Sequence, residues 1–199
     1  MQPSHRRKVV LASASPYRKA LLERLPVPFT AASPDIDESP QPGETPSQLV
    51  QRLAQAKAQA LVRQFPDALI IGCDQVAVLD GEIVGKPLSR ARAHQQLTRA
   101  SGRRMDFLTG LCVLDSKTKT HAVVCVPYAV YFRSLTEEQI QTYLRIEQPL
   151  DCASSFKSEG LGVALFEKMQ GDDPTSLIGL PLIELTRLLR NQGLDVLAG

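Results

Sequence analysis

The chain has 199 residues, of which 43% are hydrophobic and 22% charged, as in an ordinary globular protein. Its 23 Lys and Arg residues nearly balance its 21 Asp and Glu residues, which argues against a protein whose whole surface binds nucleic acid. No apolar run approaches the roughly 20 residues of a membrane helix, and the basic segment 1–8 lacks the apolar stretch of a signal peptide. We therefore expect one cytoplasmic domain, residues 1–199, without a membrane or a nucleic acid polymer as partner.

Four cysteines bear on the redox environment and on metal binding. They are widely spaced, three of them lie inside apolar stretches, and their spacing fits no zinc motif. Reduced thiols in such stretches act as small core residues. Free thiols are therefore expected at Cys73, Cys112, Cys125 and Cys152.

Apolar periodicity and turn residues predict strands and helices that alternate along the chain. Strands are expected at residues 9–12, 68–74, 105–114, 121–132 and 165–169, with a hairpin at 76–84 turned at Asp80-Gly81. Helices are expected at 17–25, 46–65, 89–102, 136–147 and 182–192, and a proline-rich acidic loop at 34–46. Alternation without an internal repeat or a dividing linker is typical of an α/β fold with a mixed sheet.

The turn after the first strand carries two hydroxyls and a cation at a helix start. Ser15 before Pro16 is a typical N-cap. Together with the unpaired N–H groups of the helix start, Ser13, Ser15 and Arg18 offer donors around a phosphate. Taken alone, the segment favours an ordinary capped helix, because caps are far commoner than phosphate sites. It is not a P-loop, since the glycines and the Gly-Lys-Ser/Thr ending are missing.

Lys57 stands out on the long helix because its neighbours at helical spacing are apolar. Leu53 and Leu61, four residues to either side, belong to a stripe that should face the core. An inward ammonium must be paired or must reach water, since an isolated buried charge costs several kcal/mol. A stem along the core edge with its head in water fits the pattern equally well.

Carboxylates and a second lysine complete the candidate residues for phosphate chemistry. Asp74 ends an apolar strand, where open α/β sheets gather ligand groups, although a turn carboxylate has the same signature. Lys86 lies in a loop, where a lone lysine is usually an ordinary surface residue. Asp35, Asp37 and Glu38 could bind a hard cation such as Mg²⁺, although acidic loops are more often merely solvated. Together these residue types are what metal-assisted phosphate chemistry needs.

Five segments, in this order, resemble the motifs of the Maf family of nucleotide pyrophosphatases. Each motif is weak alone, and five in order are jointly far more specific. They are Leu11-Ala12-Ser13-Ala14-Ser15-Pro16-Tyr17-Arg18 with Leu21-Leu22, Asp35-Ile36-Asp37-Glu38, Ala56-Lys57-Ala58, Ile71-Gly72-Cys73-Asp74-Gln75-Val76, and Gly85-Lys86-Pro87 with Ser101-Gly102 behind the next helix.

The resemblance implies a Maf/ITPase-like α/β fold, an elongated mixed sheet with flanking helices and two lobes around a cleft, often as a homodimer. It also implies hydrolysis of nucleoside triphosphates to monophosphate and pyrophosphate. In these terms Asp74 is the catalytic acid or base and Glu38 is a metal-linked acid. The implied polyphosphate contacts are Ser13, Ser15, Arg18, Lys57 and Lys86.

Departures from the common family pattern resemble the subgroup acting on 7-methyl-GTP rather than the one acting on dTTP and UTP. Many members have a second arginine where this chain has Tyr17, Asp-Thr where it has Asp74-Gln75, and a glycine-rich stretch at 154–160. An aromatic ring can stack on a cationic purine, and a carboxylate such as Glu159 can pair with guanine N–H groups. The resemblance thus assigns base specificity to Tyr17, Gln75 and Glu159, although Tyr17 also fits a surface aromatic on a helix.

In the reaction that these residues suggest, Asp74 orients or deprotonates a water for in-line attack on the α-phosphorus. A divalent cation near Glu38 and Asp74 bridges phosphates and water, and oxygen ligands favour Mg²⁺ or Mn²⁺. Two rival hypotheses remain. One is a pyrophosphatase for UTP, dTTP or damaged nucleotides, and the other is a nucleotide-binding regulator of cell division with little turnover.

Overall fold

The structure, a computed structural model, describes residues 7–150 and 152–198 and contains a seven-stranded mixed sheet flanked by helices. The strand order is β2-β1-β3-β5-β6-β7, and β4 pairs with β3 outside that path. The strands are β1 (Lys8–Ala12), β2 (Phe29–Ala32), β3 (Ala68–Leu79), β4 (Glu82–Val84), β5 (Arg104–Asp115), β6 (His121–Phe132) and β7 (Phe166–Gln170). The helices are α1 (Pro16–Leu22), α2 (Pro46–Ala60), α3 (Arg90–Ala100), α4 (Glu137–Glu147), α5 (Thr175–Ile178) and α6 (Leu182–Asn191), with short 3-10 helices η1 (Ala153–Ser155) and η2 (Leu161–Leu165). The predicted α/β class is confirmed.

Tertiary contacts divide the chain into two compact units, each assembled from segments that are distant in sequence. Unit 1 runs as far as Gln75 and adds Thr109–Val126 and the chain from Gly179 onward. Unit 2 consists of Val76–Leu108 and Pro127–Ile178. Each unit has a buried apolar core of its own. The expectation of one domain over residues 1–199 stays a prediction.

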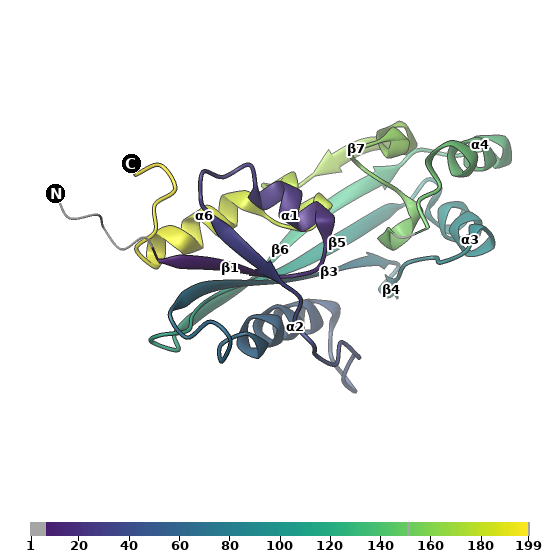
Figure 1. Cartoon of the computed structure of the whole chain (residues 1–199). Coiled ribbons are helices and arrows are strands. Elements are labelled where there is room, and N and C mark those ends of the chain that lie inside the picture. Colours follow the sequence, from purple (N-terminus) through teal and green to yellow (C-terminus); the bar gives the residue numbers. More distant parts are fainter. Residues whose placement is uncertain (1–6, 151, 199) are drawn as a thin grey trace. The chain divides into compact units, whose positions relative to one another are not determined.

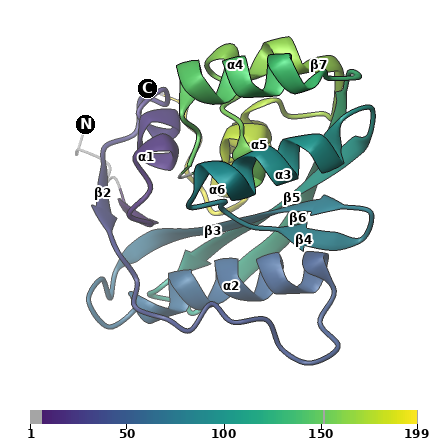
Figure 2. The same cartoon turned by 90° about the vertical axis from the view of Figure 1, so that its right-hand side faces the viewer.

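Parallel strands form the framework of unit 1. β1 pairs with β2 up to Ala12↔Ala32 and with β3 up to Ala12↔Gly72. Figures 1 and 2 show α2 on one face of these strands and α1 and α6 on the other. Because β1 and β2 end at the same edge while β3 continues, the residues that follow Gly72 lie beyond the last parallel pair.

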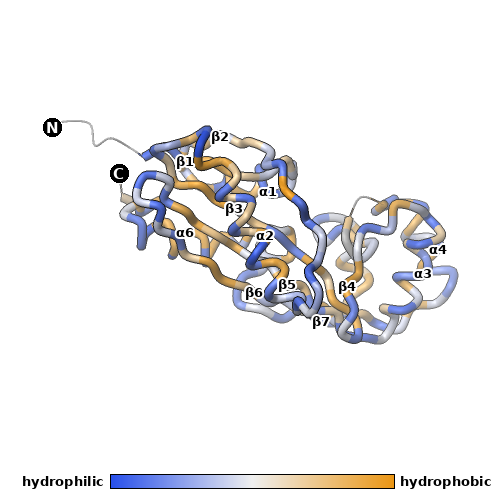
Figure 3. The backbone as a smooth tube through the Cα atoms, turned by 90° about the horizontal axis from the view of Figure 1, so that it is seen from below, coloured by the Kyte–Doolittle hydropathy of each residue, from blue (hydrophilic) through white to orange (hydrophobic). Residues whose placement is uncertain are grey.

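Two glycines let α2 lie very close to the sheet of unit 1. A Cβ built on Gly72 would be only 2.0 Å from the carbonyl oxygen of Ala54, and one on Gly110 would be 2.0 Å from that of Val50. No side chain fits at either position, so the helix backbone packs directly on the strands. Figure 3 shows the hydrophobic colour concentrated along these strands.

Unit 2 contains a hairpin and a cluster of aromatic rings. β3 and β4 turn at Asp80-Gly81, where φ is 53° and 83°, as the sequence predicted. β6 and β7 are antiparallel. Four rings pack edge to face with centroids 4.9 to 5.8 Å apart: Phe107, Phe132, Phe156 and Phe166. This packing anchors the segment that leads from Phe156 to Glu159.

Helix ends and one strand differ from the expectation. α1 ends at Leu22 rather than residue 25, and α2 ends at Ala60 rather than residue 65, since prolines soon follow both and the residue before a proline disfavours helical geometry. β2 was not predicted, because it is short and half exposed and so lacks a strong apolar pattern. Within the described residues, no helix combines the length and apolar character that crossing a bilayer requires.

The prediction that the central strand ends at Asp74 is wrong. β3 passes through Asp74 and continues to Leu79. It loses β1 as a neighbour after Gly72 and gains β4 from Ala77 onward. Asp74 and Gln75 therefore lie within β3, between the part that pairs with β1 and the part that pairs with β4, and not in a turn. Asp74 still lies just beyond the carboxyl ends of β1 and β2, where ligand groups were expected.

Candidate active site

A lysine held between two carboxylates forms the centre of the candidate site. Lys57 Nζ lies 2.7 Å from Asp74 Oδ1 and 2.9 Å from Glu38 Oε1. The side chains of Lys57 and Asp74 are 8% and 10% exposed, whereas that of Glu38 is 57% exposed. Lys57 therefore points inward and is paired, so the alternative of a head reaching into water is wrong.

Strand alternation explains why Asp74 meets α2. Gly72 and Asp74 are two residues apart and so share one face of β3. At Gly72 this face touches the α2 backbone at Ala54. Lys57 is three residues after Ala54, hence on the same side of the helix. The missing side chain at Gly72 thus lets the helix approach closely enough for the ion pair with Asp74.

The opposite face of β3 carries Cys73 and Gln75. Cys73 Sγ donates to the Gly179 carbonyl at 3.0 Å, and Gln75 Nε2 donates to Thr109 Oγ1 at 3.0 Å. Arg18 donates from Nη1 to the Cys73 carbonyl and from Nε to the Gly179 carbonyl, both at 2.9 Å. Arg18 thus ties α1 both to β3 and to the segment before α6, with two of its five donors. Burial raises the pKa of the Cys73 thiol to about 11, so this cysteine is neutral at pH 7.

The hydroxyls of Ser13 and Ser15 take part in the local start of α1. Ser13 Oγ accepts from the Ser15 N–H at 3.1 Å, and Ser15 Oγ accepts from the Arg18 N–H at 3.4 Å. The predicted N-cap at Ser15 is confirmed. A hydroxyl that accepts a backbone N–H still has a proton to donate, so the phosphate roles of both serines stay predictions.

The remaining predicted site residues lie in different parts of the chain. Tyr17 is half-buried near the start of α1, in unit 1. Lys86 is exposed in the segment between β4 and α3, and Glu159 is exposed and accepts from Ser158 Oγ at 2.9 Å. Lys86 and Glu159 belong to unit 2, whereas every other predicted site residue belongs to unit 1. Their roles stay predictions.

Of the three acids predicted to bind a cation, Asp35, Asp37 and Glu38, only Glu38 pairs with Lys57 in the described chain. Asp37 accepts from the Ser39 N–H at 2.9 Å, and hydrogen bonding by Ser39 lowers the pKa of Asp37. In the part of the chain that the structure describes, no group of three or more His, Cys, Asp or Glu side chains is placed to hold a metal ion. The assignment of Glu38 and Asp74 as metal ligands stays a prediction.

Sequence reasoning missed two residues that shape the site. Thr109 is fully buried and lies 34 residues from Gln75 in sequence, so no local signal links the pair. Gly72 did carry a signal, because a glycine inside an apolar strand indicates close approach of another backbone. That signal was available next to Asp74 and would have pointed to α2 as its neighbour.

Three curated relatives are each named 7-methyl-GTP pyrophosphatase. The relative from Pseudomonas syringae pv. tomato is 58% identical over 188 residues, which cover 94% of this chain and 98% of the relative. The one from Pseudomonas aeruginosa is 54% identical over 188 residues with the same coverage. The one from Methylobacillus flagellatus is 55% identical over 189 residues, covering 95% of this chain and 98% of the relative.

Two further comparisons concern structure and family. The solved Ham1 protein of Staphylococcus aureus is similar with a TM-score of 0.46 and 15% identity, over 78% of this chain and 89% of that one. The family model of the Maf-like proteins matches residues 8–192, a range that includes all five motifs singled out in the sequence. The chain therefore belongs to the family of Maf-like proteins.

Proposed function

We propose that the protein hydrolyses 7-methyl-GTP between its α- and β-phosphates and releases 7-methyl-GMP and pyrophosphate. The observation that carries the proposal is the Lys57 ammonium between Asp74 and Glu38, just beyond the ends of β1 and β2. This arrangement supplies a cation for phosphate oxygens and carboxylates for water and metal. The shared name of the three relatives supports the choice of substrate.

Asp74 is the proposed general base. Lys57 holds its Oδ1, while Oδ2 accepts no hydrogen bond from any residue that the structure describes. A water bound at Oδ2 transfers a proton to Asp74 as it attacks the α-phosphorus, and pyrophosphate leaves in line. Lys57 fixes the carboxylate and places a positive charge beside the phosphate oxygens.

A divalent cation fits this site as a companion of the substrate. Glu38 and Asp74 are the two carboxylates around Lys57, and Mg²⁺ is commonly held by one or two carboxylates together with substrate phosphates and water. We propose that these two side chains hold the cation of a metal–nucleotide complex, with Mg²⁺ or Mn²⁺ as the metal. When bound, the cation neutralises charge that develops on the phosphate oxygens.

Tyr17, Gln75 and Glu159 are proposed to select the methylated base. Methylation at N7 gives guanine a positive charge, so a tyrosine ring can stack on it and a carboxylate can pair with it. The bond to Thr109 fixes the Gln75 amide, which supports a recognition role for that side chain. The preference over GTP is expected to be about tenfold to a hundredfold in kcat/KM, or ~1 to 3 kcal/mol.

We also propose a cytoplasmic location. Cys73, Cys112 and Cys125 are free thiols, and burial raises the pKa of the Cys112 thiol to about 12. Free thiols suit a reducing compartment. The expected homodimer stays a prediction.

A nucleotide panel tests the proposed function. 7-Methyl-GTP, GTP, UTP and dTTP are each incubated with the protein and Mg²⁺, and pyrophosphate and orthophosphate are measured separately. We expect pyrophosphate as the product and 7-methyl-GTP as the best substrate. Asp74→Asn is the matched control for contaminating activity. Best turnover of UTP or dTTP would overturn the substrate assignment, and tight binding with negligible turnover of every nucleotide would favour the regulator.

A further inference from the structure

The loop that carries Glu38 is fastened to α2 through one arginine. Arg52, near the middle of α2, donates from Nε to Glu44 Oε1 at 2.6 Å and from Nη2 to Glu44 Oε2 at 2.8 Å. The same Nη2 donates to the Ser39 carbonyl at 3.0 Å. Figure 2 shows the loop running alongside α2 before it enters the helix. The Arg52 guanidinium therefore binds the loop at Ser39 and at Glu44, which are five residues apart.

Glu44 is itself built into the loop. Its Oε2 accepts from the Gln41 N–H at 3.0 Å, and its own N–H donates to the Gln41 carbonyl at 3.0 Å. Gly43 completes this turn with φ +76°, a conformation that other residues rarely adopt. The side chain of Glu44 is 8% exposed although it lies in a surface loop. The turn and the ion pair thus share one carboxylate.

The ion pair between Arg52 and Glu44 persists over the working pH range of an enzyme. Hydrogen bonding by Arg52 lowers the pKa of Glu44 to about 2. A two-point bond between a guanidinium and a carboxylate fixes both distance and orientation, which a lysine cannot reproduce. Both side chains are therefore charged at neutral pH.

Few other polar contacts hold the part of the loop next to Glu38. Between residues 33 and 40, the hydrogen bonds and ion pairs to the rest of the described chain are those from Arg52 to Ser39 and from Lys57 to Glu38. Glu38 is more than half exposed and is directly bonded to Ser39 in the chain. Without Arg52, Glu38 would be held by its ion pair with Lys57 alone, and an ion pair whose carboxylate is more than half exposed contributes little by itself.

We infer that Arg52 and Glu44 are positioning residues that hold Glu38 on Lys57, so that the acid is in place when the metal–nucleotide complex arrives. The inference rests on the proposed function, because it assigns Glu38 to that complex. Neither residue touches the substrate; both act through Glu38 by way of Ser39 and the turn at Gln41.

Loop order is the first test and needs no substrate. Backbone ¹⁵N relaxation is measured in the parent, in Arg52→Gln and in Glu44→Gln. The order parameters at Asp37, Glu38 and Ser39 should fall from about 0.85 to below about 0.6 in both variants. Arg187→Gln, which removes an exposed arginine–glutamate pair on α6, is the matched control and should leave them unchanged. An unchanged loop in Arg52→Gln would overturn the inference.

Binding is the second test, with the α,β-methylene analogue of 7-methyl-GTP and Mg²⁺ in calorimetry. Introduced into the parent, Arg52→Gln should weaken binding of the analogue about fivefold to thirtyfold. Introduced into Glu38→Gln, the same substitution should weaken binding less than about twofold. Arg52→Lys should lie between the parent and Arg52→Gln, since lysine keeps the charge and loses the two-point bond. Equal losses with and without Glu38 would show that Arg52 does not act through this acid.

The two tests separate this inference from the proposed function. If the parent does not bind the analogue and does not cleave 7-methyl-GTP, the proposed function fails, while the relaxation data still decide whether Arg52 holds the loop. If the parent binds and cleaves, and the loop loosens in Arg52→Gln without any loss of binding, the positioning role is wrong and the proposed function stands.

Discussion

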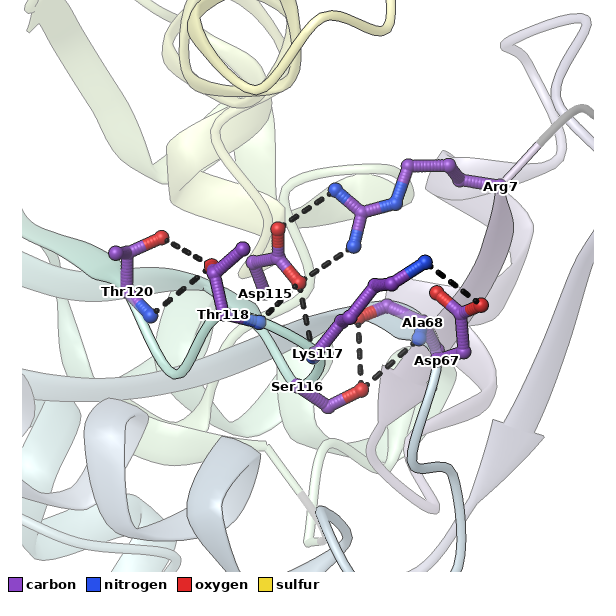
Figure 4. Close-up of polar contacts among 8 residues, drawn as sticks. All are labelled: Arg7, Asp67, Ala68, Asp115, Ser116, Lys117, Thr118 and Thr120. Atoms are coloured by element: carbon purple, nitrogen blue, oxygen red, sulfur yellow. Dashed lines mark hydrogen bonds and ion pairs between the residues drawn. The ribbon is translucent and has the colours of Figure 1, made fainter.

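Asp115 and Asp74 are both buried aspartates of unit 1, 4% and 7% exposed, and each is paired with a basic side chain. Asp115 accepts four hydrogen bonds, which Figure 4 shows as dashed lines. Arg7 donates to both of its oxygens, at 2.7 and 2.5 Å, and the N–H groups of Lys117 and Thr118 donate to Oδ1 at 2.9 and 3.2 Å. Arg7 holds the pKa of Asp115 well below its usual range.

Asp74 and Asp115 are buried to a similar extent, but they differ in the number of hydrogen bonds that their carboxylates accept. Among the described residues, Lys57 alone donates to its carboxylate, and Lys57 is shared with Glu38. A carboxylate can accept about four hydrogen bonds, and the described residues donate four to Asp115 but one to Asp74. A filled carboxylate can only hold structure, whereas an open one can bind water or metal. The number of donors is therefore a better guide to function here than burial.

The largest effect is expected when Asp74 is replaced by Asn, which keeps the shape and removes the base. Turnover of 7-methyl-GTP should fall about a thousandfold, within the range for loss of a general base. The melting temperature should move by no more than about 4 °C, because Lys57 retains Glu38 as a partner. Pyrophosphate release and thermal unfolding measure the two effects. Hydrolysis close to that of the parent would remove Asp74 from the mechanism.

Lys57→Met should affect both activity and stability. It removes the cation beside the phosphates, so kcat/KM should fall about a hundredfold. It also leaves Asp74 buried without a partner, which should lower the free energy of unfolding by roughly 1 to 3 kcal/mol in urea titrations. Lys19→Met, which removes a lysine whose side chain is 57% exposed in a surface pair, is the control and should change neither quantity appreciably. Full stability in Lys57→Met would mean that Asp74 does not need the ion pair in order to be buried.

Asp115→Asn should show the reverse pattern. We expect a loss of roughly 2 to 4 kcal/mol in the free energy of unfolding, the upper end being discounted because the Arg7 side chain is 28% exposed. The kcat/KM of the folded enzyme should stay within about twofold of the parent, because Asp115 is assigned no role in the chemistry. A large loss of activity at full stability would break the comparison between the two aspartates.

The pH dependence of stability follows from the lowered pKa of Asp115. A carboxylate with a lowered folded-state pKa contributes stability that is present above its unfolded value, 3.8, and is lost as the pH falls through that value toward the folded pKa. The parent should therefore lose more stability than Asp115→Asn between about pH 5 and pH 2. Urea midpoints at several pH values test this. Parallel curves for the two proteins would show that Arg7 does not stabilise the charged form of Asp115.

Local patterns predicted the parts of the fold that local forces decide. The N-cap at Ser15 and the turn at Asp80-Gly81 each depend on a few adjacent residues, and both are confirmed. The apolar residues at helical spacing around Lys57 allowed an inward orientation as one of two possibilities. Helical spacing indicates the face of a residue even when its partner is unknown.

Long-range pairing explains what the sequence did not show. The passage of β3 through Asp74 depends on β4 replacing β1 as its neighbour, and the bond from Gln75 to Thr109 joins two strands. The fastening of the Glu38 loop by Arg52 joins a loop to a helix. The partners in these contacts are distant in sequence, and no residue next to them indicates the pairing. These contacts could therefore not be predicted from local sequence patterns.

The smallest expected effect is at Ser154, which tests whether an unsatisfied polar group by itself marks a functional residue. Its Oγ is fully buried and has no hydrogen-bond partner among the described residues, and its backbone has φ 64°. Glycine adopts this conformation without strain and removes the unpaired hydroxyl, so Ser154→Gly should raise the free energy of unfolding by about 1 kcal/mol. Ser155→Gly is the matched control, since Ser155 has φ 61° but donates its hydroxyl to Gln96 Oε1; relief of strain and loss of that bond should nearly cancel.

Urea midpoints and kcat/KM for 7-methyl-GTP are measured for both variants. Increased stability with unchanged kcat/KM would make Ser154 a site of local strain. A buried polar group with few hydrogen bonds would then indicate function only where it is charged, as at Asp74. A fall in kcat/KM for Ser154→Gly alone would instead show that the Ser154 hydroxyl finds its partner in the substrate. The backbone N–H of Ser154 donates to the carbonyl of Gly85, next to Lys86.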